Sequence, residues 1–242
     1  MLLPKRDFLT HTKARPHKLL KQLRGIVIHW TANVSAGANA AANRSYFNQG
    51  FRSASAHYIV DDSNIIQCLP DQEVGYHCGD RPLGKYKPIG LGLMNGYKGT
   101  TPNYFTIGIE MCVNRDGNWL ETYSNTIDLV ARLYLKYQLN PGSIIRHFDV
   151  TGKQCPKPFL KPSAWEQFIQ DVIIEIQTLT FHDCKIGIVT SKQLNIRPGV
   201  SNLSRLLGVL DEGETVLWTQ ESNGWGLIAD GAWINLNFVN QI

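Results

Sequence analysis

Between residues 25 and 148, short apolar runs alternate with longer segments of helical periodicity. The runs GIVIHW (25–30), FTIGIEMCVN (105–114) and SIIRHF (143–148) have the length and apolar content of buried strands. AHYIVDD and IIQCLP flank the turn signal DSN at 62–64, which indicates a hairpin. The sequence therefore predicts an α/β fold, in which a mixed central sheet is flanked by helices.

Three segments have helical spacing. The first lies in the Ala-rich second half of 31–49, and the second covers 122–140 and stops at the breaker NPG (140–142). The third, 163–179, is expected to begin with a capping box of Ser163 and Glu166. Its predicted core face consists of Trp165, Phe168, Ile169, Val172, Ile173 and Ile176.

From about residue 183 the chain changes to short strands separated by turns. The dipeptides NG (223–224) and DG (230–231) mark tight hairpins. We therefore expect a small all-β module, a barrel without free edges. The predicted domains are 1–180 and 181–242.

Composition excludes several classes of protein. Lys and Arg total 24 against 20 Asp and Glu, and no more than two basic residues are adjacent, so no nucleic-acid partner is expected. No apolar stretch has the length of a membrane span, and the first 25 residues lack the apolar core of a signal peptide. Five cysteines are an odd number without the density of a disulfide framework, which favours reduced thiols made in the cytoplasm. A monomer is the default expectation.

The segment FTIGIEMCVN places a single acid among apolar residues. Strand alternation puts Glu110 on the face opposite to Phe105, Ile107, Ile109, Met111 and Val113. An acid on the open face of a core strand is a candidate site residue. The competing interpretation is an ion pair with a neighbouring base such as Arg146.

The loop RHFDVTGKQCPKPF (146–159) contains a histidine and a cysteine that suit zinc. His147 is expected to end a strand, and Gly152 and the following proline permit a sharp path to Cys155. A third ligand is needed, and His29 at the end of the first strand is the best candidate. His57 and His77 compete for this place, and a set of three would leave one tetrahedral position for water.

The motifs GIVIHWTAN, SASAHYIVDD, GYHCGD, FTIGIEMC and RHFDVTGKQCPKPF, in this order, resemble the type-2 (Amidase_2) family of zinc-dependent N-acetylmuramoyl-L-alanine amidases. This family includes phage endolysins, bacterial autolysins and peptidoglycan recognition proteins. The resemblance covers about residues 7–179. It implies that His29, His147 and Cys155 hold one Zn²⁺ per chain.

The resemblance also implies that Glu110 and Lys153 are the catalytic pair. Some relatives use a tyrosine one residue before the position of His57, where this chain has Ala56, and this departure favours Glu110. For Lys153 the competing interpretation is a solvated loop lysine.

The resemblance places His77 in the substrate groove. We interpret His57 as a second candidate for orienting the substrate or a ligand. Trp30 and Tyr76 are candidates for stacking on sugar or peptide, against the alternative of core packing. The segment 81–104, rich in Gly and Pro, is expected to be a surface loop at the groove rim.

The segments LNIRPG (194–199) and NGWGLI (223–228) are similar to bacterial SH3-like (SH3b) cell-wall-binding domains, apart from a proline where serine is commoner before Gly199. Together the resemblances imply hydrolysis of the amide between N-acetylmuramic acid and L-alanine, with peptidoglycan as partner. They suggest a phage or prophage endolysin of Gram-positive cell walls, released from the cytoplasm, or a secreted enzyme if an upstream signal was trimmed. The alternatives are a non-catalytic peptidoglycan receptor and a zinc peptidase that cuts within the stem peptide.

Overall fold

The computed structural model describes residues 2–79, 101–140, 142–182, 184–228 and 231–242. Its internal contacts divide the chain into two compact units, Met1–Ile176 and Gln177–Ile242. This division falls within helix α4 (Pro162–His182), four residues before the boundary expected from the change in composition. Most of the predicted rim loop 81–104, and Asp230 of the second turn signal, lie outside the described residues.

The first unit is built on a mixed six-stranded sheet, which confirms the predicted α/β class. The strand order is β1-β4-β3-β5-β2-β6. Among the described strands of this sheet, only β3 and β4 pair in antiparallel fashion, as the predicted hairpin. The strands β2, β5 and β6 are parallel neighbours, so their carboxyl ends lie at one edge of the sheet. The bounds are β1 (Lys5–Arg6), β2 (Gly25–Trp30), β3 (Tyr58–Val60), β4 (Ile65–Gln67), β5 (Thr106–Met111) and β6 (Ile144–Arg146).

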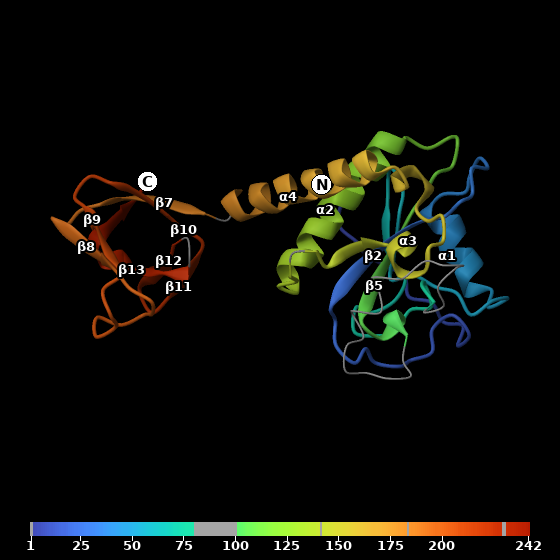
Figure 1. The fold of residues 1–242 in the computed structure, drawn as a ribbon, viewed down its shortest axis with the longest axis horizontal. Coiled ribbons are helices and arrows are strands. Elements are labelled where there is room, and N and C mark those ends of the chain that lie inside the picture. The colour runs from blue at the N-terminus through green and yellow to red at the C-terminus, as the bar shows by residue number, and fades with distance from the viewer. Residues whose placement is uncertain (1, 80–100, 141, 183, 229–230) are drawn as a thin grey trace. The chain divides into compact units, whose positions relative to one another are not determined.

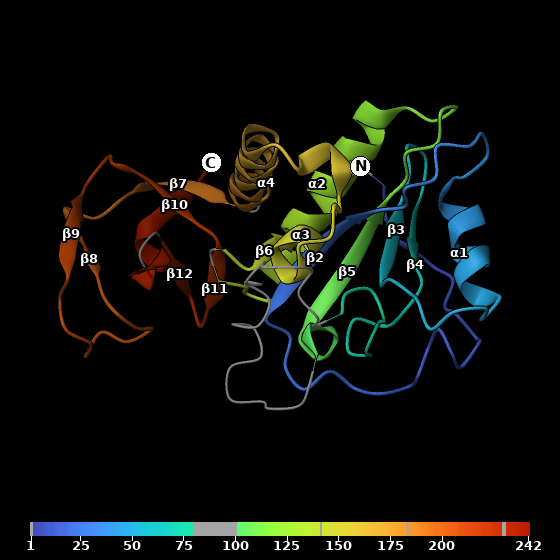
Figure 2. The ribbon, with the colours of Figure 1, turned by 45° about the vertical axis from the view of Figure 1, so that its right-hand side comes forward.

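Helices cover both faces of this sheet (Figure 1). Helices α2 (Trp119–Lys136) and α4 pack on the face that carries Ile28 and Ile109. Helix α1 (Ala40–Asn48) lies on the opposite side, as Figure 2 shows, over a smaller cluster that contains Ile59. Because side chains alternate along a strand, the α2 face receives the aliphatic residues and the other face receives His29 and Glu110. No helix among the described residues has the length and apolar character to cross a membrane.

Two predictions at the zinc-loop end of the sheet were wrong in detail. His147 does not end a strand but begins the short helix α3 (His147–Thr151), where the Asp149 carboxylate accepts from the backbone N–H of Arg146 at 2.8 Å. Helix α4 begins at Pro162, so Ser163 is not its N-cap. Proline suits the first helical position, because an N–H at this position would have no acceptor within the helix.

Two further predictions were wrong at the helices. Ile173, predicted to face the core, is 41% exposed, because the buried stripe of α4 runs through Phe168 and Val172 and leaves the next residue at its edge. Helix α2 ends at Lys136 instead of continuing to residue 140. Gln138 adopts a left-handed conformation (φ 47°), which stops the helix earlier than the proline-containing signal.

The second unit consists of small antiparallel sheets around one core. The sheets have the orders β10-β7-β14, β11-β12-β13 and β8-β9. Asn223 and Gly224 both have positive φ (50° and 79°) between β11 and β12, which confirms the predicted two-residue hairpin. The bounds are β7 (Lys185–Val189), β8 (Gln193–Ile196), β9 (Gly208–Asp211), β10 (Thr215–Trp218), β11 (Gln220–Ser222), β12 (Trp225–Leu227), β13 (Trp233–Asn235) and β14 (Val239–Gln241).

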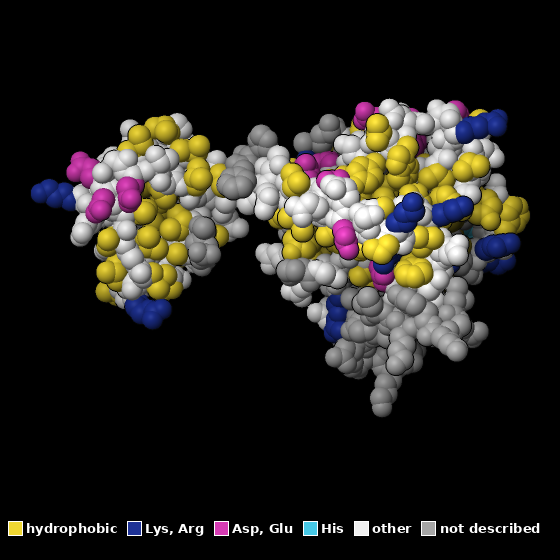
Figure 3. Space-filling view, turned by 45° about the horizontal axis from the view of Figure 1, so that its top comes forward, with side chains coloured by type: hydrophobic (Ala, Val, Ile, Leu, Met, Phe, Trp, Pro, Cys, Tyr) yellow, Lys and Arg dark blue, Asp and Glu magenta, His cyan; other side chains and the backbone are white. Residues whose placement is uncertain are grey.

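Among the described side chains on the face in Figure 3, Lys and Arg are scattered and form no continuous basic patch.

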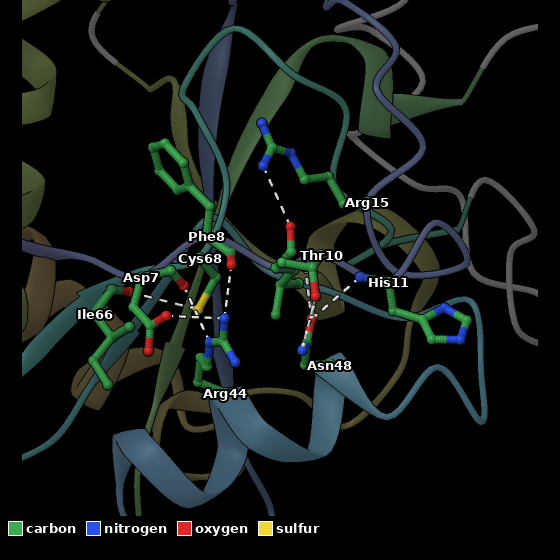
Figure 4. A network of polar contacts seen from close by, with 10 residues as sticks. Asp7, Phe8, Thr10, His11, Arg15, Arg44, Asn48, Ile66 and Cys68 are labelled. Carbon is green, nitrogen blue, oxygen red and sulfur yellow. Dashed lines mark hydrogen bonds and ion pairs between the residues drawn. The ribbon is translucent and has the colours of Figure 1, made fainter.

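Two side chains of α1 fasten the N-terminal segment to the first unit (Figure 4). Arg44 donates to the carbonyl oxygens of Asp7 (3.1 Å) and Phe8 (2.7 Å) and forms an ion pair with the Asp7 carboxylate. The Asn48 Oδ1 accepts from the backbone N–H of Thr10 at 2.7 Å. These bonds satisfy two carbonyl oxygens and one N–H of the segment that follows β1.

We expect Arg44→Ala to destabilise the protein by about 1–3 kcal/mol, because the two carbonyl oxygens lose a charged donor. Urea denaturation gives the free energy of unfolding, and limited proteolysis reports release of residues 2–18. Arg52 is an exposed arginine just after α1, and Arg52→Ala is the control. It should change neither the free energy of unfolding nor the proteolysis of residues 2–18. Equal stability of the two variants would contradict the role of Arg44.

Candidate metal centre and active site

The three parallel strands bring the predicted site residues to one edge of the sheet. His29 pairs with Glu110 in the register of β2 and β5. On the other side of β2, Ile28 pairs with Arg146, so His147 follows directly beside His29. The carboxyl ends of neighbouring parallel strands therefore place two imidazoles and a carboxyl together, although the residues are far apart in sequence.

His29, His147 and Cys155 form a compact donor set. The Nδ1 atoms of His29 and His147 are 3.1 Å apart, and Cys155 Sγ lies 3.6 Å from His29 Nδ1. The three donor atoms all lie within 4.8 Å of one another, and all three residues are buried. Tetrahedral zinc with ordinary bond lengths separates two nitrogens by about 3.3 Å and a nitrogen and a sulfur by about 3.6 Å. The residues therefore fit a zinc ion.

The loop after β6 is held in place by Arg146. Its guanidinium makes two bonds to the carboxylate of Asp149 (2.7 and 3.0 Å) and one to the carbonyl oxygen of Phe159 (2.8 Å). Gly152 ends α3 in the left-handed conformation (φ 80°), which supplies the sharp turn before Cys155. Since Arg146 is engaged with Asp149, the alternative in which it pairs with Glu110 is not what the structure shows.

Burial keeps the two imidazoles in the neutral form that binds metals. Loss of water around the ring lowers the pKa of His29 well below its ordinary value and that of His147 to about 4, and the positive charge of Lys153 adds to both effects. Burial raises the pKa of the Cys155 thiol to about 12, while a hydrogen bond from the Trp30 backbone opposes this shift. A metal ion would have to displace the thiol proton on binding.

Glu110 has an unpaired carboxylate oxygen beside this set. Its Oε2 is enclosed and has no hydrogen-bond partner among the described residues. Burial raises the pKa of Glu110 to about 8, and the ammonium of Lys153 partly opposes this rise. Lys153 itself is exposed, two residues before Cys155. A carboxyl with a pKa near neutrality is suited to accept and return a proton.

The two competing histidines occupy other positions. His57 is fully buried and uses both ring nitrogens, since Nδ1 accepts from the Gly108 N–H at 3.0 Å and Nε2 lies 2.9 Å from the carbonyl oxygen of Glu73. The Nδ1 atom of His77 contacts Nε2 of His29, on the side of the His29 ring away from the donor set. Of the three candidates for the third ligand, only His29 meets both His147 and Cys155.

The two predicted stacking residues, Trp30 and Tyr76, occupy different segments of the fold. Trp30 follows His29 in β2, so alternation places its side chain on the opposite face of the sheet. Tyr76 is half-buried, and its backbone pairs with Ser55. Sequence reasoning missed Asn103, whose Oδ1 accepts from two backbone N–H groups at 77–78, because no motif or spacing marks it.

The fold of the first unit is the α/β amidase-type fold of endolysin catalytic domains. The catalytic domain of XlyA matches with a TM-score of 0.59 at 30% identity, covering 71% of this chain and 99% of that one. A mutant endolysin from Bacillus subtilis matches with a TM-score of 0.60 at 29% identity over similar shares, 71% and 99%.

Sequence similarity identifies the family. The family described as N-acetylmuramoyl-L-alanine amidase matches residues 19–158, and the chain belongs to this family. A probable N-acetylmuramoyl-L-alanine amidase of Bacillus licheniformis is 40% identical over 158 residues, which cover 62% of this chain and 41% of that protein. The chain thus spans about two fifths of the length of these curated relatives.

Proposed function

We propose that the chain hydrolyses the amide between N-acetylmuramic acid and L-alanine in bacterial peptidoglycan, with one zinc ion held by His29, His147 and Cys155. The observation that carries the proposal is the position of the Glu110 carboxyl beside this donor set, with an Oε2 that has no hydrogen-bond partner among the described residues. Family membership supports the reaction class.

Each proposed catalytic residue has a role that follows from its surroundings. When bound, zinc supplies a Lewis acid that polarises the amide carbonyl and acidifies water. Glu110, with its raised pKa, accepts the proton of the attacking water and passes it to the leaving alanine nitrogen. The exposed ammonium of Lys153 stabilises the negative charge that develops on the amide oxygen. The charge of Lys153 reaches this site, since it shifts the pKa of both Glu110 and His147.

For the second unit we propose an SH3-like barrel that binds the cell wall. Its antiparallel strands and its Asn223–Gly224 hairpin support this assignment. A weak wall binder linked to a catalytic unit raises the local substrate concentration without adding contacts at the active site. An endolysin of Gram-positive bacteria is the biological setting that we propose, because solved endolysin structures share the fold of the first unit.

Digestion of purified Gram-positive peptidoglycan tests the reaction. We expect soluble stem peptides whose new amino terminus is L-alanine, without new reducing sugar ends, and we expect a chelator to stop their release. Mass spectrometry identifies the amine, and a reducing-sugar assay detects glycan cleavage. Binding without release would instead support the receptor alternative, and new amines within the stem peptide would support the peptidase alternative. Either result would overturn the proposed function.

A further inference from the structure

The second ring nitrogen of His29 points away from the donor set. Its Nε2 lies 3.1 Å from Nδ1 of His77, whereas its Nδ1 faces His147 and Cys155. A metal-binding imidazole presents a lone pair to the ion, so the proton of a neutral His29 has to reside on Nε2. A hydrogen-bond acceptor that keeps the proton on Nε2 therefore leaves the lone pair of Nδ1 available to a metal ion.

The hydrogen bonds of His77 assign the protons of both rings. His77 Nε2 lies 3.3 Å from the carbonyl oxygen and 3.3 Å from the Oγ1 of Thr106. A carbonyl oxygen only accepts, and the Thr106 hydroxyl already donates to the carbonyl oxygen of Pro102 at 2.9 Å. The protonated nitrogen of His77 is therefore Nε2. Its Nδ1 is an acceptor, and His29 Nε2 is the donor.

We propose that His77 is a positioning residue that holds His29 in the Nε2-protonated tautomer, with Nδ1 directed at the metal ion. The inference rests on the proposed metal centre. It gives His77 a role behind the ligand, in place of the substrate contact suggested by the family resemblance. Partners of this kind fix the orientation and tautomer of a histidine ligand.

The surroundings of His77 hold its ring in place. The ring lies over Gly108, where an added Cβ would approach the His77 Cγ to 2.4 Å, so only glycine leaves room for it. The Oδ1 of Asn103 accepts from the backbone N–H groups of His77 (3.3 Å) and Cys78 (2.9 Å). The ring of His57 packs edge-on, with the centroids 5.7 Å apart. The acceptor for His29 is thus fixed by backbone contacts and ring packing together.

Two substitutions separate the acceptor from the volume of the ring. His77→Leu removes the acceptor, and we expect zinc affinity to fall by about 10–100-fold, measured by competition with a chromophoric chelator at pH 7.5. His77→Asn retains a polar atom near the position of Nδ1 and should recover most of this loss. Tyr58→Phe is the control. It removes a buried hydrogen bond to Asp71 on the other face of the sheet and should lower stability while leaving zinc affinity close to that of the wild type.

A second measurement does not depend on any variant folding. In the metal-free wild-type protein, ¹⁵N NMR of the imidazoles should show the proton of His29 and that of His77 on Nε2. A proton on His29 Nδ1, or equal zinc affinity of wild type and His77→Leu, would overturn the role of His77 alone. A wild-type protein that binds no zinc would overturn the metal centre itself, so the two failures are distinguishable.

Discussion

Replacing Glu110 with glutamine is expected to remove most of the turnover and to make the metal-free protein more stable above pH 8. Loss of a general base lowers turnover by about 10²–10⁴-fold. The stability effect follows from burial, which raises the pKa of Glu110 from its ordinary 4.5 to about 8. Zinc content should remain unchanged, because Glu110 is not one of the three donors.

The sign of the stability effect depends on pH. Below about pH 4.5, Glu110 is protonated in both the folded and the unfolded chain, so glutamine gives no gain. Between about pH 4.5 and 8 the unfolded wild type loses the Glu110 proton while the folded wild type retains it, so the wild type progressively loses stability that the variant keeps. Above pH 8 this loss is complete, and the folded wild type buries a carboxylate whose Oε2 has no partner among the described residues. The gain should be on the order of a few kcal/mol at pH 9.

Thermal unfolding at pH 4 and pH 9, in the presence of a chelator, measures this difference. Glu166→Gln is the control, because it makes the same substitution at an exposed glutamate on α4, and it should affect neither turnover nor stability. Wild-type turnover in Glu110→Gln would remove Glu110 from the mechanism. Equal stability of this variant and the wild type at pH 9 would show that the carboxylate finds a partner.

Replacing Cys155 with serine is expected to abolish zinc binding and, with it, peptidoglycan hydrolysis. A thiolate is a much better zinc ligand than a hydroxyl, and two imidazoles alone do not hold the ion. A ligand that binds only the folded state stabilises it by about 4 kcal/mol at a thousandfold excess over its dissociation constant. A chelator should therefore lower the unfolding temperature of the wild type and leave that of Cys155→Ser unchanged.

Metal analysis of the purified proteins and thermal scans with and without a chelator check this prediction. Cys68→Ser is the matched control, because Cys68 is also fully buried but lies in the cluster under α1. That variant should lose stability and keep its zinc. If Cys155→Ser retained zinc at the wild-type level, the proposed donor set would be wrong.

Local pattern in the sequence was sufficient for much of the fold. The runs around His29 and Glu110 became β2 and β5, because a short apolar run is typical of a strand buried on both faces and side chains alternate between the two faces of a strand. The hairpin at Asn223–Gly224 followed from two residues that tolerate positive φ. The start of α4 at Pro162 and the early end of α2 escaped prediction, because local sequence constrains helix ends less than helix interiors.

The site divides in the same way between sequence and structure. Strand periodicity and loop composition by themselves proposed Glu110, His147 and Cys155 as site residues, and left three histidines as candidates for the remaining ligand. Only the parallel pairing of β2 with β5 and β6 brings His29, and neither His57 nor His77, beside both His147 and Cys155, because a register between distant strands depends on contacts that no local pattern encodes. The position of His77 beside His29, and the burial that raises the pKa of Glu110, likewise appear only in the folded protein.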